Sequence, residues 1–123
     1  MILGIGIDLM EIEKIEKQIQ SDVHLRKVFT PAEIRECKSV VRSAERFAGR
    51  FAAKEATMKA LGTGHARGVL WRDIEVFRHG GPPQLRLSGG ALRHFEAMRA
   101  RRSLLTITHA ETLAMAQVLL LSE

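Results

Sequence analysis

Hydrophobic and polar positions along the chain alternate first with the period of a strand and then with the period of a helix. Residues 2–9 (ILGIGIDL) present one aliphatic face and one face of small residues, which carries Gly4 and Gly6 and ends in Asp8. An alternation of period two predicts a β-strand. Because glycine leaves the backbone bare, the small face indicates that another element packs close to this strand.

Stretches with helical spacing follow. Apolar residues three and four positions apart predict a helix over residues 11–20, and residues 22–29 continue as a shorter helical piece. Thr30-Pro31-Ala32-Glu33 has the N-cap, the first-turn proline and the glutamate of a capping box, which predicts a helix over residues 31–42. Residues 44–61 form the longest helical pattern, and glycines end it.

The C-terminal half of the chain predicts mostly strands. Residues 73–78 and 83–88 have strand character on either side of a Gly-Gly-Pro-Pro turn, residues 90–102 have helical spacing, and residues 103–110 and 115–121 form a final hairpin. The order is β-α-α-α-β-β-α-β-β when the short helical piece is counted with its predecessor. It indicates an α+β fold, with a mainly antiparallel sheet packed against the long central helix.

The composition fits one domain of residues 1–123. Apolar residues make up 46% of the chain and charged residues 27%, the ordinary balance of a globular protein. No apolar run is long enough to span a membrane, and the N-terminus lacks the features of a secretory signal. Cys37 is the sole cysteine, so we expect a reduced, cytoplasmic protein without a disulfide.

The charge balance narrows the choice of partner. Lys plus Arg exceed Asp plus Glu by 19 − 14 = 5, and the pI is near 10.0. This favours an acidic partner, which is a nucleic acid, a phosphorylated small molecule or an acidic protein. A basic nucleic-acid-binding domain is therefore one alternative, although one Trp, no Tyr and five scattered Phe supply few side chains for stacking on bases.

The central helix carries charges that an Ala-rich helix does not need. Its side chains fall on parallel lines at about 100° per residue: an apolar stripe of Phe47, Phe51 and Met58, bordered on one side by Glu55 and Lys59 and on the other by Arg46, Arg50 and Lys54. The simplest interpretation is an i,i+4 pair between Glu55 and Lys59 on a solvated face, with the basic residues as ordinary surface.

A metal site is the competing interpretation. Glu55 borders the apolar stripe, where an unpaired carboxylate is costly, and the strand that ends in Asp8 can pack beside this helix. Two carboxylates, completed by water and phosphate oxygens, match the usual coordination of Mg²⁺, and the basic residues of the helix would then meet the phosphates. His109, at the end of a core strand, is most simply a hydrogen-bonded structural residue, and Gly62-Thr63-Gly64 is most simply a helix C-cap.

Two motifs together resemble a known family. They are the strand Gly4-Ile5-Gly6-Ile7-Asp8, with the Glu11-Ile12 that follows it, and the helix RFAGRFAAKEA of residues 46–56 with KALGTG of residues 59–64. Both resemble the holo-[acyl-carrier-protein] synthases, the small type of 4′-phosphopantetheinyl transferase. The resemblance extends to FTPAE at residues 29–33, TITH at 106–109 and AQV at 116–118, so it spans nearly the whole chain.

The resemblance implies an enzyme of fatty acid biosynthesis, with Mg²⁺ as its cofactor. It would transfer the phosphopantetheine arm of coenzyme A to a serine of apo acyl carrier protein, releasing adenosine 3′,5′-bisphosphate. Asp8 and Glu55 carry over as Mg²⁺ ligands and Lys59 as a cation that binds phosphate and stabilises the leaving group. The implied coenzyme A site comprises Arg46, Arg50, Lys59, Gly62, Thr63, Gly64, Thr108 and His109. The family is typically a homotrimer with active sites between subunits.

The resemblance leaves some points open. Met10 stands where larger members of the superfamily have a further carboxylate, so the number of Mg²⁺ ligands is open. The serine proton could pass to Glu55, to Asp8 or to a metal-bound water. The carrier could also be a domain of polyketide or peptide synthesis.

The carrier proteins of this family present an acidic helix. Exposed cations on the first two helical pieces are candidates to meet it, with ordinary solvated surface as the equal alternative: Lys14, Lys17, Arg26 and Lys27.

Overall fold

The structure is a computed structural model that describes residues 1–123. In chain order its elements are β1 (Ile2–Glu11), α1 (Ile12–Gln18), α2 (Asp22–Val28), α3 (Pro31–Lys38), α4 (Ser43–Leu61), η1 (Trp71–Asp73), β2 (Ile74–Phe77), β3 (Gln84–Leu87), α5 (Gly89–Ala97), β4 (Arg102–Ala110) and β5 (Leu113–Leu121). The predicted α+β class is confirmed. None of these helices has the length and apolar composition required to cross a bilayer.

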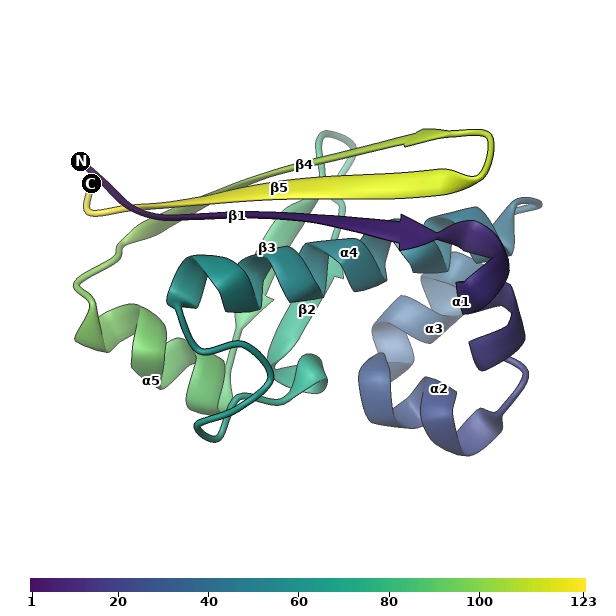
Figure 1. The fold of residues 1–123 in the computed structure, drawn as a ribbon, viewed down its shortest axis with the longest axis horizontal. Coiled ribbons are helices and arrows are strands. Elements are labelled where there is room, and N and C mark those ends of the chain that lie inside the picture. Colours follow the sequence, from purple (N-terminus) through teal and green to yellow (C-terminus); the bar gives the residue numbers. More distant parts are fainter.

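Two antiparallel sheets frame the long helix α4. The larger sheet has the strand order β1-β5-β4, and the smaller one pairs β2 with β3. Figure 1 shows α4 lying along one face of the larger sheet, with α1, α2 and α3 gathered at one end of the molecule and both chain termini at the other. The central helix thus contacts both sheets and the helical cluster.

The bare face of β1 lies directly on the backbone of α4, as its glycines predict. A Cβ atom added to Gly6 would overlap the carbonyl oxygen of Ala56, and one added to Gly4 would overlap that of Ala60. The strand and the helix therefore run in opposite directions at the closest approach that two backbones allow. Asp8 lies two residues beyond Gly6 on the same face of β1, and its side chain contacts Lys59 of α4.

Helix α4 is buried on more than one side. Of its 19 residues, 12 are buried. Ala52 and Ala56 pack in the cluster that includes the inner face of the larger sheet. The predicted apolar stripe is confirmed as buried, and two of its residues, Phe47 and Phe51, pack with the helices at the other end of the molecule. Only the two narrow flanks between these faces remain available for function.

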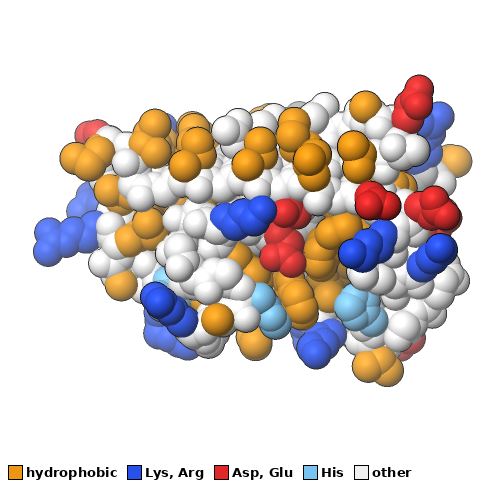
Figure 2. All heavy atoms as spheres, in the orientation of Figure 1, with side chains coloured by type: hydrophobic (Ala, Val, Ile, Leu, Met, Phe, Trp, Pro, Cys, Tyr) orange, Lys and Arg blue, Asp and Glu red, His pale blue; other side chains and the backbone are white.

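The aliphatic face of β1 is exposed, although the alternation of this strand resembles that of a core strand. Ile5, Ile7 and Leu9 are 60%, 50% and 59% exposed, and Leu104 on β4 is 46% exposed. Figure 2 shows hydrophobic side chains in a row along the upper edge of the molecule, where Figure 1 places the larger sheet. Within one chain, α4 covers one face of the larger sheet, and the other face exposes a stripe of apolar side chains.

Several element boundaries differ from prediction. Residues 22–29 form a helix of their own, α2, so four helices rather than three lie between β1 and β2. The helix predicted over residues 90–102 ends at Ala97, because Arg99 adopts a left-handed φ of 66°. The capping box is confirmed: Thr30 Oγ1 accepts from the backbone N–H of Glu33, and Glu33 Oε1 accepts from that of Thr30.

The glycine contact predicts a specific sensitivity of the fold. Gly6→Ala places a methyl group against the Ala56 carbonyl, so we expect the free energy of unfolding to fall by at least about 2 kcal/mol. Gly81→Ala is the matched control, because a Cβ at Gly81 meets open space and should change the free energy by less than about 0.5 kcal/mol. Urea unfolding measures both, and equal stability of the two variants would contradict the predicted contact.

Candidate active site

One flank of α4 brings Lys59 to the side chain of Asp8. The ammonium Nζ lies 3.0 Å from Asp8 Oδ1, to which it donates, and donates again to the backbone carbonyl of Ile7 at 3.0 Å. The side chain of Asp8 is 16% exposed and that of Lys59 is 55% exposed. The two motifs at the N-terminus and in the central helix therefore meet in space, as predicted.

Glu55 lies one turn before Lys59 on the same flank. It makes no ion pair with Lys59, so the simplest interpretation of these two charges, an i,i+4 pair on a solvated face, is wrong. Instead, Glu55 Oε1 accepts a hydrogen bond of 3.4 Å from the indole N–H of Trp71. Glu55 is partly buried and retains one carboxylate oxygen without a protein partner.

The donors on this flank fit a hard divalent cation. Asp8 and Glu55 supply carboxylate oxygens only, the ligand type that Mg²⁺ prefers. No group of three or more His, Cys, Asp and Glu side chains in the chain could hold a metal ion. Two protein ligands with the remainder from water and phosphate is the usual arrangement for Mg²⁺, and it suits a site that also binds a phosphorylated substrate.

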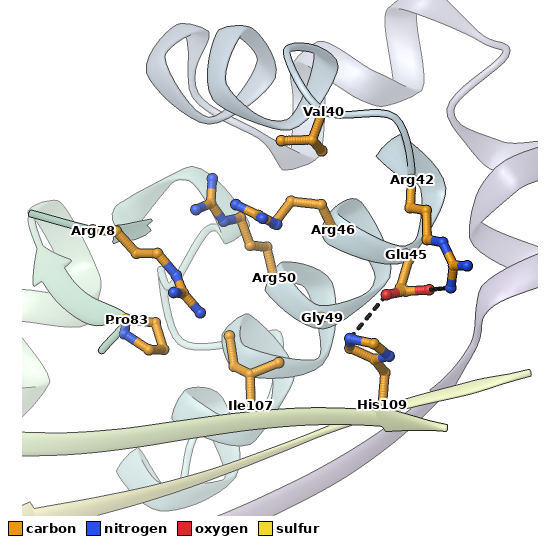
Figure 3. Close-up of a pocket in the computed structure, with 10 residues that line it drawn as sticks. All are labelled: Val40, Arg42, Glu45, Arg46, Gly49, Arg50, Arg78, Pro83, Ile107 and His109. Carbon is orange, nitrogen blue, oxygen red and sulfur yellow. Dashed lines mark ion pairs between the residues drawn. The ribbon is translucent and has the colours of Figure 1, made fainter. Parts of the chain in front are cut away.

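A basic pocket lies on the other flank of α4. It has a volume of about 320 Å³ and contains the cationic side chains of Arg42, Arg46, Arg50 and Arg78, together with Glu45 and His109. Figure 3 shows the guanidinium groups of Arg46, Arg50 and Arg78 around one space, with Ile107 and Pro83 below them. Four arginines against one glutamate leave a net charge of 4 − 1 = +3 in the lining, which suits a phosphorylated ligand.

Two carboxylates fix the cations of this pocket. Glu45 Oε1 lies 2.8 Å from His109 Nε2, and Glu45 Oε2 lies 3.6 Å from Arg42 Nη1; the dashed lines in Figure 3 mark these two ion pairs. Glu36 pairs with both Arg46, at 2.7 Å, and the buried Arg50. His109 thus contacts Glu45 and also faces the pocket.

Lys54 is not part of a phosphate-binding ridge, which corrects one expectation. Its side chain is fully buried, and its three N–H groups have acceptors in Glu33 Oε1, at 2.8 Å, the carbonyl of Trp71, at 3.1 Å, and the carbonyl of Ile74. Burial lowers the pKa of Lys54, while the Glu33 carboxylate opposes this effect. The residue joins α4 to α3, to η1 and to the first residue of β2.

Cys37 is buried against Arg50, which lines the pocket, and its thiol is unreactive. Arg50 Nη1 donates to its sulfur at 3.5 Å. Burial raises the pKa of Cys37 to about 12, although the charge of Arg50 opposes this effect. The thiol therefore stays protonated at neutral pH and offers no nucleophile.

The two flanks of α4 face in opposite directions. Nine residues separate Arg46 from Glu55 and Arg50 from Lys59, and nine steps of about 100° amount to about half a turn beyond two full turns. The expectation that the arginines meet the same phosphates as Glu55 and Lys59 is therefore not met within one chain.

Four other predicted residues do not line the pocket. Thr108 is exposed, and because it alternates with Ile107 and His109 along β4 it faces the opposite side of the sheet. Gly62, Thr63 and Gly64 form the C-cap of α4, with a left-handed φ of 77° at Gly62. The backbone N–H groups of Thr63 and Gly64 both donate to the carbonyl of Met58. They lie one turn beyond Lys59, at the end of the first flank.

A family comparison decides between the interpretations of this site. The model of the 4′-phosphopantetheinyl transferase superfamily matches residues 4–115, which covers both flanks of α4. The chain belongs to this superfamily. This match supports the interpretation of the chain as a transferase rather than as a nucleic-acid-binding domain.

Similar proteins agree with this assignment over the whole length of the chain. A holo-[acyl-carrier-protein] synthase of Koribacter versatilis is 48% identical over 123 residues, with 98% of each chain covered. The crystal structure of a Bacillus anthracis holo-(acyl-carrier-protein) synthase in complex with CoA (3′,5′-ADP) is 39% identical, with a TM-score of 0.83 and coverage of 100% of this chain and 99% of the other. That of Neisseria meningitidis has a TM-score of 0.88 at 28% identity, covering 98% of both chains.

Several residues of this phosphopantetheinyl transferase site have no signal that identifies them in one sequence. Trp71 lies in a loop segment, and its contact with Glu55 depends on the path between α4 and β2. Arg78 reaches the pocket from the turn after β2. Glu45, near the start of α4, contacts His109 on β4, which is distant in sequence. Only its spacing before the Arg46 motif could have drawn attention to it.

Proposed function

We propose that the protein transfers the 4′-phosphopantetheine group of coenzyme A to a serine of apo acyl carrier protein, with Mg²⁺, and releases adenosine 3′,5′-bisphosphate. The contact of Lys59 with Asp8, one turn from Glu55, is the observation that carries the proposal. It unites two carboxylates and an ammonium group in a chain that resembles coenzyme A-bound synthases along its whole length.

The chemistry asks three things of these side chains. Asp8 and Glu55 hold Mg²⁺, which when bound neutralises negative charge on the pyrophosphate. Lys59, released from part of its contact with Asp8, binds a phosphate oxygen and stabilises the bisphosphate as it leaves. The serine oxygen forms a bond to the phosphorus of the phosphopantetheine, the bond to the bisphosphate oxygen breaks, and the serine proton passes to a base.

The opposed flanks support a site shared between chains. Because the pocket of Arg46, Arg50 and His109 lies about half a turn from Glu55 and Lys59, the pocket of one copy meets the metal-binding flank of another more readily than its own. The exposed stripe of Ile5, Ile7 and Leu9 offers an apolar surface for such an assembly. The assembly is the homotrimer that the family resemblance implies.

The acidic helix of the carrier protein would bind the end of the molecule formed by α1 and α2. Lys14, Lys17, Arg26 and Lys27 are all exposed there. Arg26 is paired with Asp22 at 2.8 Å and Lys17 lies 3.8 Å from Glu13, whereas Lys14 and Lys27 have no carboxylate partner in the chain. Lys14 and Lys27 are therefore the cations most available to an acidic surface, in the cytoplasm where such carriers and coenzyme A occur together.

The transfer reaction has a direct assay. Apo acyl carrier protein, incubated with this protein, coenzyme A and Mg²⁺, should gain the mass of one phosphopantetheine, and EDTA should prevent the gain. Glu55→Gln removes a ligand charge, so we expect a rate at least about 100-fold lower, measured by mass spectrometry at fixed Mg²⁺. Full activity of Glu55→Gln would refute its role, and no gain with several carriers would refute the reaction.

Charge reversal tests the docking surface. The double variant Lys14→Glu, Lys27→Glu should raise the KM for acyl carrier protein about fivefold or more and leave the KM for coenzyme A unchanged, because only the carrier contacts this end. Arg101→Glu is the control, because Arg101 is also exposed and its backbone N–H donates to Leu121 near the C-terminus. Both chain termini lie at the end of the molecule away from α1 and α2. If both changes raised the KM for acyl carrier protein equally, the carrier would not bind specifically at α1 and α2.

A further inference from the structure

Trp71, the only tryptophan of the chain, lies against the flank of α4 that carries Glu55. Its indole Nε1 donates to Glu55 Oε1 at 3.4 Å. An indole N–H is a donor only, so Glu55 Oε1 is the acceptor in this contact. It also engages one oxygen of the carboxylate and leaves the other free.

One ring stacks on the indole of Trp71 and a second ring lies near it. His65 stacks on it with centroids 3.7 Å apart and an interplanar angle of 16°, and Phe51 lies 6.2 Å away. Trp71 also packs against two buried clusters of the core. The N–H therefore has a fixed direction.

The backbone of Trp71 is held as firmly as its ring. Lys54 Nζ donates to the Trp71 carbonyl at 3.1 Å, and the buried carboxylate of Glu33 holds that ammonium group at 2.8 Å. Asp73 Oδ2 accepts the backbone N–H of Leu70 at 3.1 Å and closes the short turn. Lys54 thus holds the backbone of Trp71 in place, and the side chain of Trp71 in turn contacts Glu55.

We propose that Trp71 is a positioning residue for the metal-binding carboxylate: its N–H holds Glu55 Oε1, so that the other oxygen is presented to the cation with little loss of side-chain freedom. This inference rests on the proposed function, in which Asp8 and Glu55 hold Mg²⁺. Hydrogen bonds that orient a metal ligand change metal affinity about 10- to 100-fold. Ring packing alone would stabilise the fold without changing metal affinity.

The test is direct metal binding in the presence of coenzyme A, with Mn²⁺ as the probe and its free form measured by electron paramagnetic resonance. Trp71→Phe keeps an aromatic ring and loses the N–H, so the Kd for Mn²⁺ should rise about tenfold or more. The Kd for coenzyme A in EDTA should stay unchanged. Leu70→Ala, an exposed change in the same turn, is the control and should leave the Mn²⁺ affinity unchanged.

Isosteric replacement covers the case in which Trp71→Phe does not fold. Because the chain has one tryptophan, growth on benzothienylalanine, which has a sulfur in place of the indole N–H, changes Trp71 alone. The same loss of Mn²⁺ affinity is expected. In the Glu55→Gln background neither replacement should lower the affinity further, because Trp71 acts through Glu55.

The outcomes separate the two levels of the proposal. If Glu55→Gln weakens Mn²⁺ binding but both tryptophan replacements bind as the unmodified protein does, the positioning role is wrong and the metal site stands. If Glu55→Gln binds Mn²⁺ as tightly as the unmodified protein, the proposed metal site is wrong, and the positioning role with it.

Discussion

The direct contact between the backbones of β1 and α4 determines where every other part of the site lies. Gly4 and Gly6 allow the strand to lie on the carbonyl groups of Ala60 and Ala56. A side chain at either glycine would overlap these carbonyl groups and push β1, with Asp8, away from α4. The pairing of Asp8 with Lys59 thus follows from the absence of two side chains, and the proposed metal-binding flank depends on it.

A second constraint holds the opposite side of α4. The buried Lys54 and Glu33 connect α3, α4 and the residues before β2, and every polar hydrogen of the ammonium group has an acceptor. Removal of one partner of such a pair leaves an unpaired buried charge, which is strongly unfavourable. The pair therefore fixes the segment that carries Trp71, so a structural interaction in the core also determines the surroundings of Glu55.

Local patterns predicted most of the elements and the chemical groups, and they placed Glu55 and Lys59 on the other side of the apolar stripe from the arginines. They did not predict which distant residues lie opposite each side chain. The bare face of β1 and the capping box at Thr30 were predicted because both depend on near neighbours in the chain. Lys54 was expected on a basic surface because helical spacing does not reveal that Glu33, 21 residues earlier, lies opposite it. Angles around α4, also readable from the sequence, place Arg46 and Glu55 on opposite sides of the helix, so within one chain the arginines do not meet the phosphates bound at Glu55.

The shared site is the central claim, and complementation of two defective variants tests it most directly. Glu55→Gln impairs the metal-binding flank and His109→Ala impairs the pocket, so each alone should have little activity. If a site combines two chains of a trimer, random co-assembly of the variants in equal amounts leaves about one site in four with both residues intact. Co-expressed, co-purified protein should then regain about a quarter of the unmodified rate of transfer to acyl carrier protein. A co-assembled mixture as inactive as the separate variants would show that both flanks act within one chain, against this account.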